Sequence, residues 1–409
     1  MDSGRVLFDS AAKINERARQ RITKGVGAPG DILLSHKGTV GKVALAPDAA
    51  PPFVCSPQTT FWRTRDQNRL DRKYLYAFLR SPGFRAQLAT RAGETDMAPY
   101  VSLTSQRGLS VVLPPIEEQR AIAHILGTLD DKIDLNRRMN ETLEAIARAL
   151  FKSWFVDFDP VRAKAEGRDP GLPKHLADLF PDRFEDSELG EIPAGWDVQT
   201  LDQVVTEIET GGRPKGGVSE IRDGVPSIGA ESIVGLGQFD YAKTKYVPPE
   251  YFNAMRRGRV RNRDVLLYKD GGRPGEFEPH VTMFGDGFPF STCAINEHVY
   301  RLRANPEFGQ LLLFFWLSSE LAMEEMRVNG TGVAIPGLNS TQARSLTVLV
   351  PPPSIAKEFD EAVDPAVRRL LAASSESRSL GALLGALLPR LVSGELSAVS
   401  ADHLEGRVT

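Results

Sequence analysis

The hydrophobic pattern of this chain is dominated by two long stretches in which apolar residues recur at alternating steps of four and three. Such a heptad pattern predicts an α-helix with one continuous apolar seam. The helices are expected at residues 116–156 and 353–396. The first seam contains Ile122, Leu126, Leu129, Ile133, Asn136, Asn140, Leu143, Ala147 and Leu150. The second contains Phe359, Val363, Ala366, Leu370, Ala373, Ser377, Leu380, Leu384 and Leu387.

Neither helix can hide such a seam alone, so the two helices are predicted to pair as an antiparallel coiled coil. Polar Asn140 and Ser377 occupy matching seam positions, where a buried polar group can fix the register. Pro365 is an irregularity near the start of the second helix, and Pro389 is expected to end it. Residues 117–154 would extend about 57 Å as a helix. The alternative is that each helix packs only on its own domain.

A segment of mixed strand and helix character precedes each long helix. Runs of β-branched residues and leucine predict strands at 31–35, 110–115, 264–268 and 347–352. The apolar stretches 74–81 and 311–319 predict buried helices. A double proline closes each segment and permits a helix to begin, because proline is tolerated in a first helical turn. The predicted fold class is therefore α/β (α+β).

The two segments are copies of each other at a shift of 237 positions: Phe53 falls on Phe290, Ser81 on Ser318, and Leu150 on Leu387. A repeat of this length indicates two whole domains of one kind, with pseudo-twofold symmetry and a ligand that has two comparable half-sites. The expected organisation is a first domain at 1–115, a long helix at 116–156, a mostly extended connector at 157–188, a second domain at 189–352, a second long helix at 353–396 and a flexible tail at 397–409.

Composition changes this picture little. The chain has 409 residues and a formal net charge of −3 at pH 7, which neither requires nor excludes nucleic acid as a partner. No run of about 18 apolar residues is present and the N-terminus lacks a signal-peptide pattern, so a cytoplasmic protein is expected. Cys55 and Cys293 lie at nearly equivalent repeat positions, which favours two separate buried thiols over one disulfide.

Three segments carry a resemblance to a known family. Residues 113–161, 187–196 and 387–396 closely resemble the specificity subunits of Type I restriction–modification systems, and the likeness covers nearly the whole chain. The resemblance implies two target-recognition domains, each reading one half of a split, asymmetric sequence in double-stranded DNA. It also implies that the helical rod sets their spacing and docks two modification subunits. Those partners carry adenine methyltransferase chemistry with S-adenosylmethionine, and restriction (motor) subunits that use ATP and Mg²⁺ complete the enzyme.

The first domain is shorter than the second at its N-terminal side. Only 30 residues precede Asp31, whereas about 75 separate Leu189 from Asp264. Aligning Lys13 with Lys245 leaves the early part of the second domain without a counterpart in the first. Either the true start lies upstream, or the first recognition domain is cut short and lacks early strands.

No catalytic, cofactor or metal motif is recognisable. Residues 38–42 do not match a phosphate-binding loop, and the glycine-containing stretch at 235–240 is more typical of a turn. Six histidines without helical pairing and two cysteines do not suggest a zinc site. The chain is therefore interpreted as non-catalytic and without a cofactor of its own. The rival hypotheses are an internally duplicated nuclease or methyltransferase and a coiled-coil scaffold with no role on DNA.

DNA contacts require cationic and hydrogen-bonding side chains in loops. The candidates are Lys37, Thr39, Lys42, Arg63, Arg65, Arg213, Lys215, Lys243, Lys245, Lys269 and Arg273. For each, a solvated surface charge is the alternative. The loops 38–42 and 271–275 are candidates on equal terms with ordinary turns. The basic run 256–263 suits phosphate contact.

An aromatic segment at 150–158 ends the first long helix. Exposed Phe151, Trp154 and Phe155 would suit a partner-binding surface. The alternative is that these side chains cap the helix and pack on the second domain.

Overall fold

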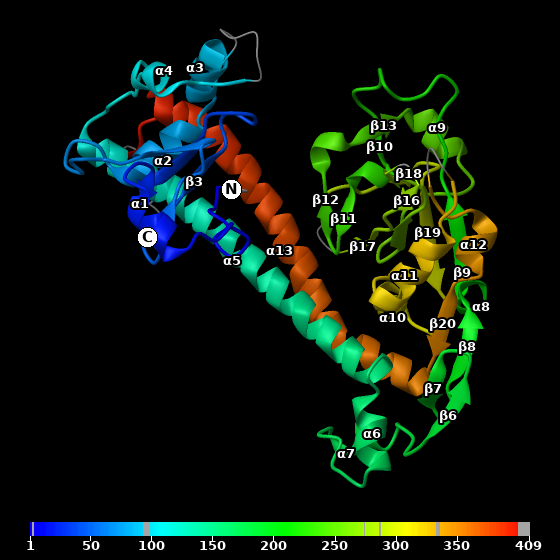
Figure 1. The fold of residues 1–409 in the computed structure, drawn as a ribbon. Helices are drawn as coiled ribbons and strands as arrows, with labels where there is room; N and C mark the ends of the chain where they lie inside the picture. Colours follow the sequence, from blue (N-terminus) through cyan, green and yellow to red (C-terminus); the bar gives the residue numbers. More distant parts are fainter. Residues whose placement is uncertain (2–3, 93–98, 274, 286–287, 333–335, 400–409) are drawn as a thin grey trace, which may run out of the picture. The chain divides into compact units, whose positions relative to one another are not determined.

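The chain divides into two compact units. The computed structural model describes residues 1–409 except 2–3, 93–98, 274, 286–287, 333–335 and 400–409. Unit 1 comprises residues 1–134 and 379–409, and unit 2 comprises residues 135–378. The long helices α5 (Ile116–Phe155) and α13 (Pro353–Ser393) each contribute residues to both units (Figure 1). Among the described residues, no helix is long and apolar enough to cross a membrane.

Unit 1 is built on a small antiparallel sheet of order β3-β2-β5. Its elements are α1 (Glu16–Arg21), β1 (Val26–Gly27), β2 (Ile32–Ser35), β3 (Val43–Leu45), β4 (Phe53–Val54), β5 (Thr59–Trp62), α2 (Arg72–Arg80), α3 (Pro82–Ala92) and α4 (Leu103–Arg107). Asp71 caps α2 by accepting a hydrogen bond from the Tyr74 amide at 2.9 Å. The α2 side chains Tyr74, Phe78 and Leu79 are then buried with Ile32 and Leu34 of β2.

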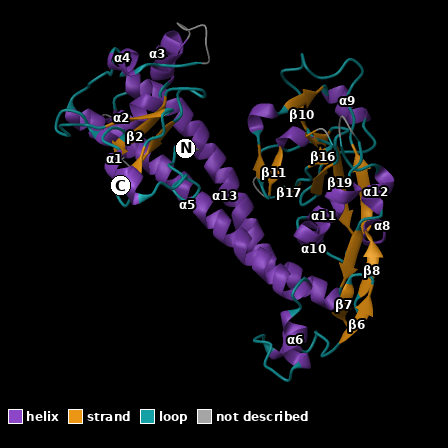
Figure 2. Cartoon of the chain, viewed as in Figure 1, coloured by secondary structure: helices purple, strands orange, loops and turns teal. Residues whose placement is uncertain are grey.

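Unit 2 is larger and contains several small sheets around an antiparallel sheet of order β17-β14-β19-β9 (Figure 2). Its first elements are α6 (Asp159–Ala165), α7 (Lys174–Ala177), β6 (Phe184–Ser187), β7 (Gly190–Pro193), β8 (Asp197–Thr200), α8 (Leu201–Val204), β9 (Val205–Thr210), β10 (Val225–Ile228), the 3₁₀ turn η1 (Ala230–Ser232), β11 (Ile233–Gly235), β12 (Gln238–Phe239), the 3₁₀ turn η2 (Tyr241–Lys243), β13 (Lys245–Val247) and α9 (Pro249–Ala254). The remaining elements are β14 (Val265–Tyr268), β15 (Gly272–Arg273), β16 (Glu276–Phe277), β17 (Val281–Met283), β18 (Ala294–Ile295), β19 (Val299–Ala304), α10 (Gln310–Leu317), α11 (Glu320–Asn329), α12 (Ser340–Arg344) and β20 (Thr347–Val350).

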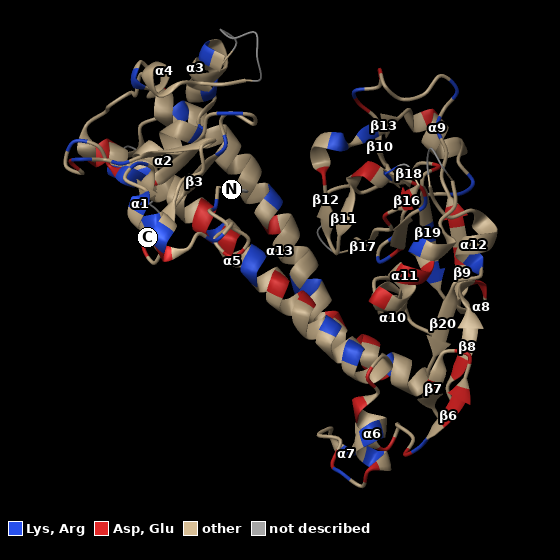
Figure 3. Ribbon diagram, in the orientation of Figure 1, with Lys and Arg blue, Asp and Glu red and all other residues tan. Residues whose placement is uncertain are grey.

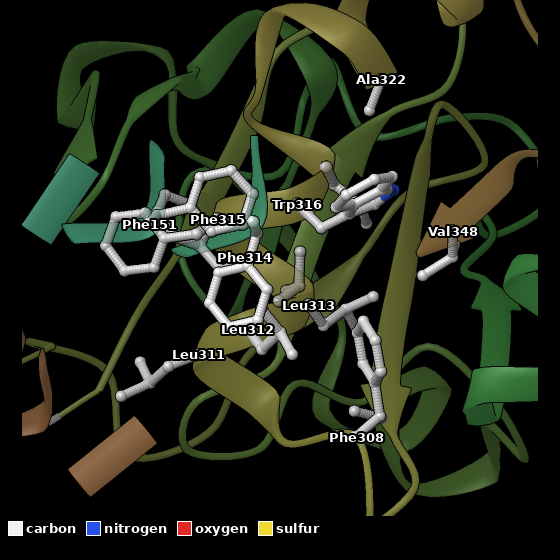
Figure 4. Packing of buried hydrophobic residues seen from close by; sticks show 14 of the residues in the cluster. Phe151, Phe308, Leu311, Leu312, Leu313, Phe314, Phe315, Trp316, Ala322 and Val348 are labelled. Atoms are coloured by element: carbon white, nitrogen blue, oxygen red, sulfur yellow. The ribbon is translucent and has the colours of Figure 1, made fainter. Parts of the chain in front are cut away.

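Helix α10 lies at the centre of the unit 2 core. All its side chains from Leu311 to Leu317 are buried, as expected for a helix that is apolar on every face (Figure 4). Asp360 of α13 accepts hydrogen bonds from the Leu311 and Leu312 amides at the N-terminus of α10. Burial of this carboxyl raises its pKa to about 6, against the opposing effect of those amide bonds.

The two long helices run antiparallel within each unit. In unit 2, the Asn136 side chain donates to Glu376 at 2.8 Å and that of Asn140 donates to Ser374 at 3.0 Å. Further along α5, Phe155 packs edge-on against Phe359, near the start of α13. The seam is therefore closed partly by hydrogen bonds, which specify register more strictly than apolar contacts do.

The same pairing recurs in unit 1 with the opposite helix ends. Ile122 and Leu126 of α5 share a buried cluster with Leu388 and Leu391 of α13. The described seam positions in both units are buried or half-buried. The prediction of two long antiparallel helices is confirmed.

Several local expectations are wrong. Residues 110–115 do not form a strand in the structure, unlike their repeat partners in β20. Pro389 does not end α13, which continues to Ser393 and also passes through Pro365. A proline near a helix end removes one backbone donor but does not prevent another turn when the flanking residues keep helical geometry. The connector expected to be mostly extended contains α6, α7 and β6.

The aromatic segment at the end of α5 is not an exposed surface. Phe151, Trp154 and Phe155 are each at most 5% exposed. Phe151 stacks on Phe155 and on Phe315, of which Figure 4 shows Phe151 and Phe315. Phe155 also packs at a tilt against Trp154 and Trp196. The partner-binding interpretation of these three residues is wrong. Their large aromatic side chains are buried in the core of unit 2, where removing so much apolar surface from water stabilises the fold.

Both cysteines are free, as predicted. Cys293 is buried, whereas Cys55 is only half-buried, so the expectation of two buried thiols holds for one of them. Burial raises the pKa of the Cys55 thiol to about 11. Residues 400–409 of the expected flexible tail lie outside the described residues.

Replacing Phe155 with alanine should lower the free energy of unfolding of unit 2 by about 3–5 kcal/mol, because the cavity would form among tightly packed rings. Urea unfolding followed by tryptophan fluorescence would measure this change, since Trp154 and Trp196 adjoin Phe155. The exposed Val328 of α11 supplies the control Val328→Ala, expected to change stability by less than about 0.5 kcal/mol. Equal effects of the two substitutions would contradict the buried position of Phe155.

Candidate nucleic-acid interface

The central sheets of the two units share a hydrogen-bonding pattern at one strand end. In unit 2, β14 is followed by Lys269, whose amide donates to the His298 carbonyl and whose carbonyl accepts from the Leu338 amide. In unit 1, β2 is followed by His36, whose amide donates to the Gln58 carbonyl and whose carbonyl accepts from the Val101 amide. This repeated pattern identifies the two strand ends as equivalent.

The opposite strand end is also equivalent in the two units, and there a buried carboxylate precedes the strand. Asp31 accepts hydrogen bonds from the Ala28 amide and, through both oxygens, from Arg63 at 2.6 and 2.7 Å. Asp264 accepts from the Arg261 amide and from Arg303. The α/β (α+β) prediction with two similar domains is confirmed.

In unit 2, the strand end at Asp264 carries a larger ion-pair network than the equivalent end of unit 1. Arg301 is 1% exposed and pairs with Asp264, Glu209 and Glu207. The hydrogen bond from Arg301 lowers the pKa of Glu207. A buried arginine with three carboxylate partners is a structural element, because losing one partner would leave uncompensated buried charge.

The other strand end of unit 2, where Lys269 follows β14, is here called its free strand end. The charged loops that the sequence predicts as DNA contacts lie there. Arg213 follows β9 and pairs with Glu297 at 2.9 Å. His298 lies 2.5 Å from Asp270 and 3.3 Å from Glu297, and Lys269 pairs with Asp270 at 2.9 Å. These ion pairs join three loops that are distant in the sequence, all at the same end of the strands.

Two further candidate cations join this group through Glu231 of η1. Lys245 pairs with the Glu231 carboxylate, and Lys243 donates to the Glu231 backbone carbonyl at 3.3 Å. Burial alone would raise the pKa of Glu231, but the hydrogen bond from Lys245 and the charges of Lys245 and Arg213 lower it overall. Arg213 therefore interacts electrostatically with Glu231 as well as with Glu297.

Lys215 and Arg273 extend the group into solvent. Both side chains are exposed, and neither forms an ion pair with a described residue. Arg273 belongs to the hairpin β15–β16 that begins just after Asp270, and Pro274 of the predicted loop 271–275 lies outside the described residues. Figure 3 shows the basic and acidic positions of this part of unit 2. Of the six candidates of unit 2, Arg213, Lys215 and Lys269 lie in loops, Lys243 ends η2, Lys245 begins β13 and Arg273 ends β15.

In unit 1 the structure separates the candidates into two groups. Lys37, Thr39 and Lys42 are exposed in the turn that links β2 and β3, at the free strand end. The Ser35 hydroxyl closes this turn by donating to the Thr39 carbonyl at 2.5 Å and accepting from the Lys42 amide at 2.8 Å. This turn is the part of unit 1 that corresponds to the Lys269 loop of unit 2.

Arg63 and Arg65 lie at the other end of β5. Arg63 is occupied by Asp31 and also stacks over the Phe61 ring, 4.9 Å from its centroid. This position argues for a structural role, equivalent to that of Arg303 in unit 2. Arg65 is exposed, but it follows the same buried end and does not join the Lys37 turn.

The basic run 256–263 is mostly committed to internal contacts. Arg259 donates to the Phe252 and Asn253 carbonyls, Arg261 pairs with Glu207, and Arg263 pairs with Asp364. Arg256 and Arg257 are exposed. The run therefore offers fewer cations for phosphate contact than its sequence suggests.

Sequence reasoning missed the carboxylates that hold the cations. Glu231, Asp270 and Glu297 are separated by many residues, and only the sheet brings them together. Sequence reasoning also gave no role to His298, which is hydrogen-bonded to Asp270. Its place immediately before the strand that pairs with β14 is the signal that could have located it. Within the described ranges, no group of three or more His, Cys, Asp and Glu side chains is placed to hold a metal ion.

Chemically, this strand end is a set of hydrogen-bond donors held in place by neighbouring carboxylates. Arginine and lysine side chains can exchange such partners for phosphate oxygens or for base acceptors, and the protein carboxylates would then disfavour anions that bind without the matching geometry. The arrangement is suited to binding a ligand with phosphate or base acceptors rather than to catalysing a reaction.

Comparison with known proteins shows a similarity in the first part of the chain. Residues 20–145 match the family model described as the Type I restriction modification DNA specificity domain. This stretch of the chain is therefore similar to the DNA specificity domain of Type I systems. The resemblance to Type I specificity subunits that the sequence predicts is therefore confirmed.

Relatives extend this similarity beyond the specificity domain. The Type I restriction enzyme MjaIX specificity subunit of Methanocaldococcus jannaschii is 24% identical, over 94% of this chain and 81% of the relative. The HindI specificity subunit of Haemophilus influenzae is 26% identical, over 73% of this chain and 71% of the relative. The crystal structure of a Type I S subunit from M. genitalium shares the fold, with a TM-score of 0.52 and 16% identity over 91% of this chain and 85% of that one.

Proposed function

We propose that the chain is the DNA sequence-specificity subunit of a Type I restriction–modification complex and has no catalytic activity of its own. One observation carries the proposal. Each unit presents cationic or hydrogen-bonding loops at the corresponding end of its own central sheet, and residues 20–145 match the DNA specificity domain. Each unit would read one half of a bipartite site in double-stranded DNA.

The contacts divide by chemistry. Lysines such as Lys37, Lys42 and Lys215 suit phosphate oxygens, whereas Arg213, Arg273 and Thr39 can approach base edges in the major groove. Phosphate contacts fix the position of a reader on the duplex, and base contacts give the sequence preference. Two such readers in one chain match a target with two half-sites.

The partners follow from the same proposal. Two modification subunits would dock on the long helices and supply adenine methylation with S-adenosylmethionine, and restriction subunits using ATP and Mg²⁺ would complete the complex in the cytoplasm. The docking surface does not include Phe151, Trp154 or Phe155, because these are core residues of unit 2. Exposed apolar positions of α5 such as Leu135 and Ile146 are the better candidates.

The first test compares the methylated adenines of host cells with and without this chain. Methylation at one bipartite sequence should depend on the chain, while the purified chain incubated with DNA, S-adenosylmethionine and Mg²⁺ should neither methylate nor cut. Unchanged methylation in its absence would reject the proposal, and activity of the chain alone would favour the duplicated-enzyme hypothesis. A scaffold with no role on DNA would leave the assembled complex without salt-dependent DNA binding.

Arg213→Ala and Arg273→Ala should each reduce discrimination at one base position by about 1–3 kcal/mol, because a base-reading arginine gains bidentate hydrogen bonds there. Methylation rates on oligonucleotides with single base changes would measure the loss. Arg327→Ala is the matched control, since Arg327 is an arginine of α11 paired with Glu320 and Glu324. Unchanged rate and specificity in both variants would exclude these arginines as base readers.

Removing one heptad from α5 together with the matching heptad of α13 should shorten the unread spacer of the site. Seven residues correspond to about 10.5 Å of helix, roughly three base pairs of B-DNA. Methylation of a set of sites with graded spacers would show the new optimum. A purified heptad-deletion complex that still prefers the original spacing would refute the role of the helices in setting it.

A further inference from the structure

Arg213 and Glu297 form an ion pair at the free strand end of unit 2 whose hydrogen-bonding groups are only partly used. The Arg213 Nε atom lies 2.9 Å from Glu297 Oε1, and 35% of the Arg213 side chain is exposed. Neither terminal amino group of Arg213 donates a hydrogen bond to a described residue. Glu297 Oε2 has no hydrogen-bond partner in the described ranges, although a carboxylate offers about four lone-pair sites. The pair therefore has donors and acceptors to spare.

A close approach of two backbone segments places these side chains beside each other. The Gly211 amide donates to the Asn296 carbonyl at 3.2 Å. A Cβ atom at Gly211 would lie 1.6 Å from the Ile295 carbonyl oxygen, so only glycine permits this approach. The contact joins the chain two positions before Arg213 to the residue just before Glu297.

The loop that carries Glu297 is also held by other contacts. The Asn296 amide donates to the Ile228 carbonyl at 3.0 Å. The side chain of Asn296, a residue 3% exposed, accepts from the His298 amide at 2.9 Å. The His298 ring lies 3.3 Å from Glu297 and 2.5 Å from Asp270. Such support lowers the entropy cost of fixing a long side chain when it binds a ligand.

The charges around this pair disfavour a phosphate group as its ligand. Three cationic side chains are matched with three carboxylates: Arg213 with Glu297, Lys245 with Glu231, and Lys269 with Asp270. Apart from His298, the formal charges of these groups cancel, so they give no net attraction to a phosphate. Base edges are uncharged sets of donors and acceptors, which a balanced ion pair can match.

The unused groups of the pair match one base pair in the major groove. A G·C pair presents the N7 and O6 acceptors of guanine beside the N4 amino donor of cytosine. The two terminal amino groups of Arg213 supply donors for the guanine, and the Glu297 carboxylate supplies an acceptor for the cytosine. An A·T pair fits poorly, because the N6 amino group of adenine would meet an arginine donor.

We propose that Arg213 and Glu297 together read one G·C base pair in the half-site recognised by unit 2. This inference rests on the proposed function of the chain and names a base pair that the same site takes. Arg213 contacts guanine, whereas Glu297 both holds Arg213 and accepts from cytosine. His298 and Asp270 act through Glu297 and are positioning residues.

The first experiment expresses the wild-type chain or a variant in host cells that lack it and sequences the methylated adenines. Arg213→Ala and Glu297→Ala should both relax the recognised sequence at the same G·C pair. Methylation of sites with another base pair there should rise by roughly tenfold or more relative to the original site. Arg327→Ala and Glu324→Ala remove the partners of another exposed ion pair of unit 2 and should leave the sequence unchanged.

The second experiment changes the DNA and needs no variant, so it remains decisive if a variant fails to fold. Replacing the guanine of that pair with 7-deazaguanine removes the N7 acceptor and leaves O6 in place. Methylation of this duplex by the purified complex should be roughly tenfold slower than that of the unmodified duplex. The complex with Arg213→Ala should not distinguish the two duplexes.

Two kinds of failure are distinguishable. Relaxation at different positions in the two alanine variants, or no effect of 7-deazaguanine at any G·C pair of the site, would overturn the base-pair assignment and leave the specificity function intact. An equal loss on every sequence in Arg213→Ala would make Arg213 a phosphate contact instead. Wild-type cells without chain-dependent methylation would refute the proposed function, and this inference with it.

Discussion

The apolar seam of the two long helices holds both units together internally. Each unit contains a part of both helices: Ile122 of α5 and Leu388 of α13 belong to one buried cluster, and Phe155 packs against Phe359 in the other unit. Because each helix needs a partner along its seam, a unit cannot bury its own core without the segment that arrives from the far end of the sequence. The hydrogen bonds of Asn136 and Asn140 to α13 then restrict the register that the apolar contacts alone would leave loose.

Within each unit, charge is divided between the two ends of the central sheet. At one end, the buried carboxylates of Asp31 and Asp264 hold Arg63 and Arg303, whose own side chains remain partly exposed. At the other end the cations lie in solvent-facing loops, paired with carboxylates that are themselves partly exposed. A basic residue in this chain therefore has a different role according to the strand end at which it lies, which is why Arg63 and Lys37 separate although both are cations near the same strands.

The repeat is imperfect in a way that has physical consequences. Residues 197–210 supply unit 2 with two strand pairings, and the corresponding positions of unit 1 remain unpaired among its described residues. Val112 and Leu103 are exposed there, whereas the repeat partner of Val112, Leu349, is buried.

The repeat, the two heptad helices and the buried strands β2 and β14 could be predicted from the residue pattern alone, because they depend on periodicities that local geometry imposes. The sequence also carried the resemblance to the specificity subunits. It could not determine that 110–115 stays unpaired, since a strand forms only where a partner strand is present. It could not assign Phe151, Trp154 and Phe155 to a core, nor Arg63 to Asp31, because an apolar or charged residue has the same local pattern whether it meets solvent, a partner or its own chain. Only the tertiary structure decides which of these surrounds the side chain, since that depends on residues far away in the sequence.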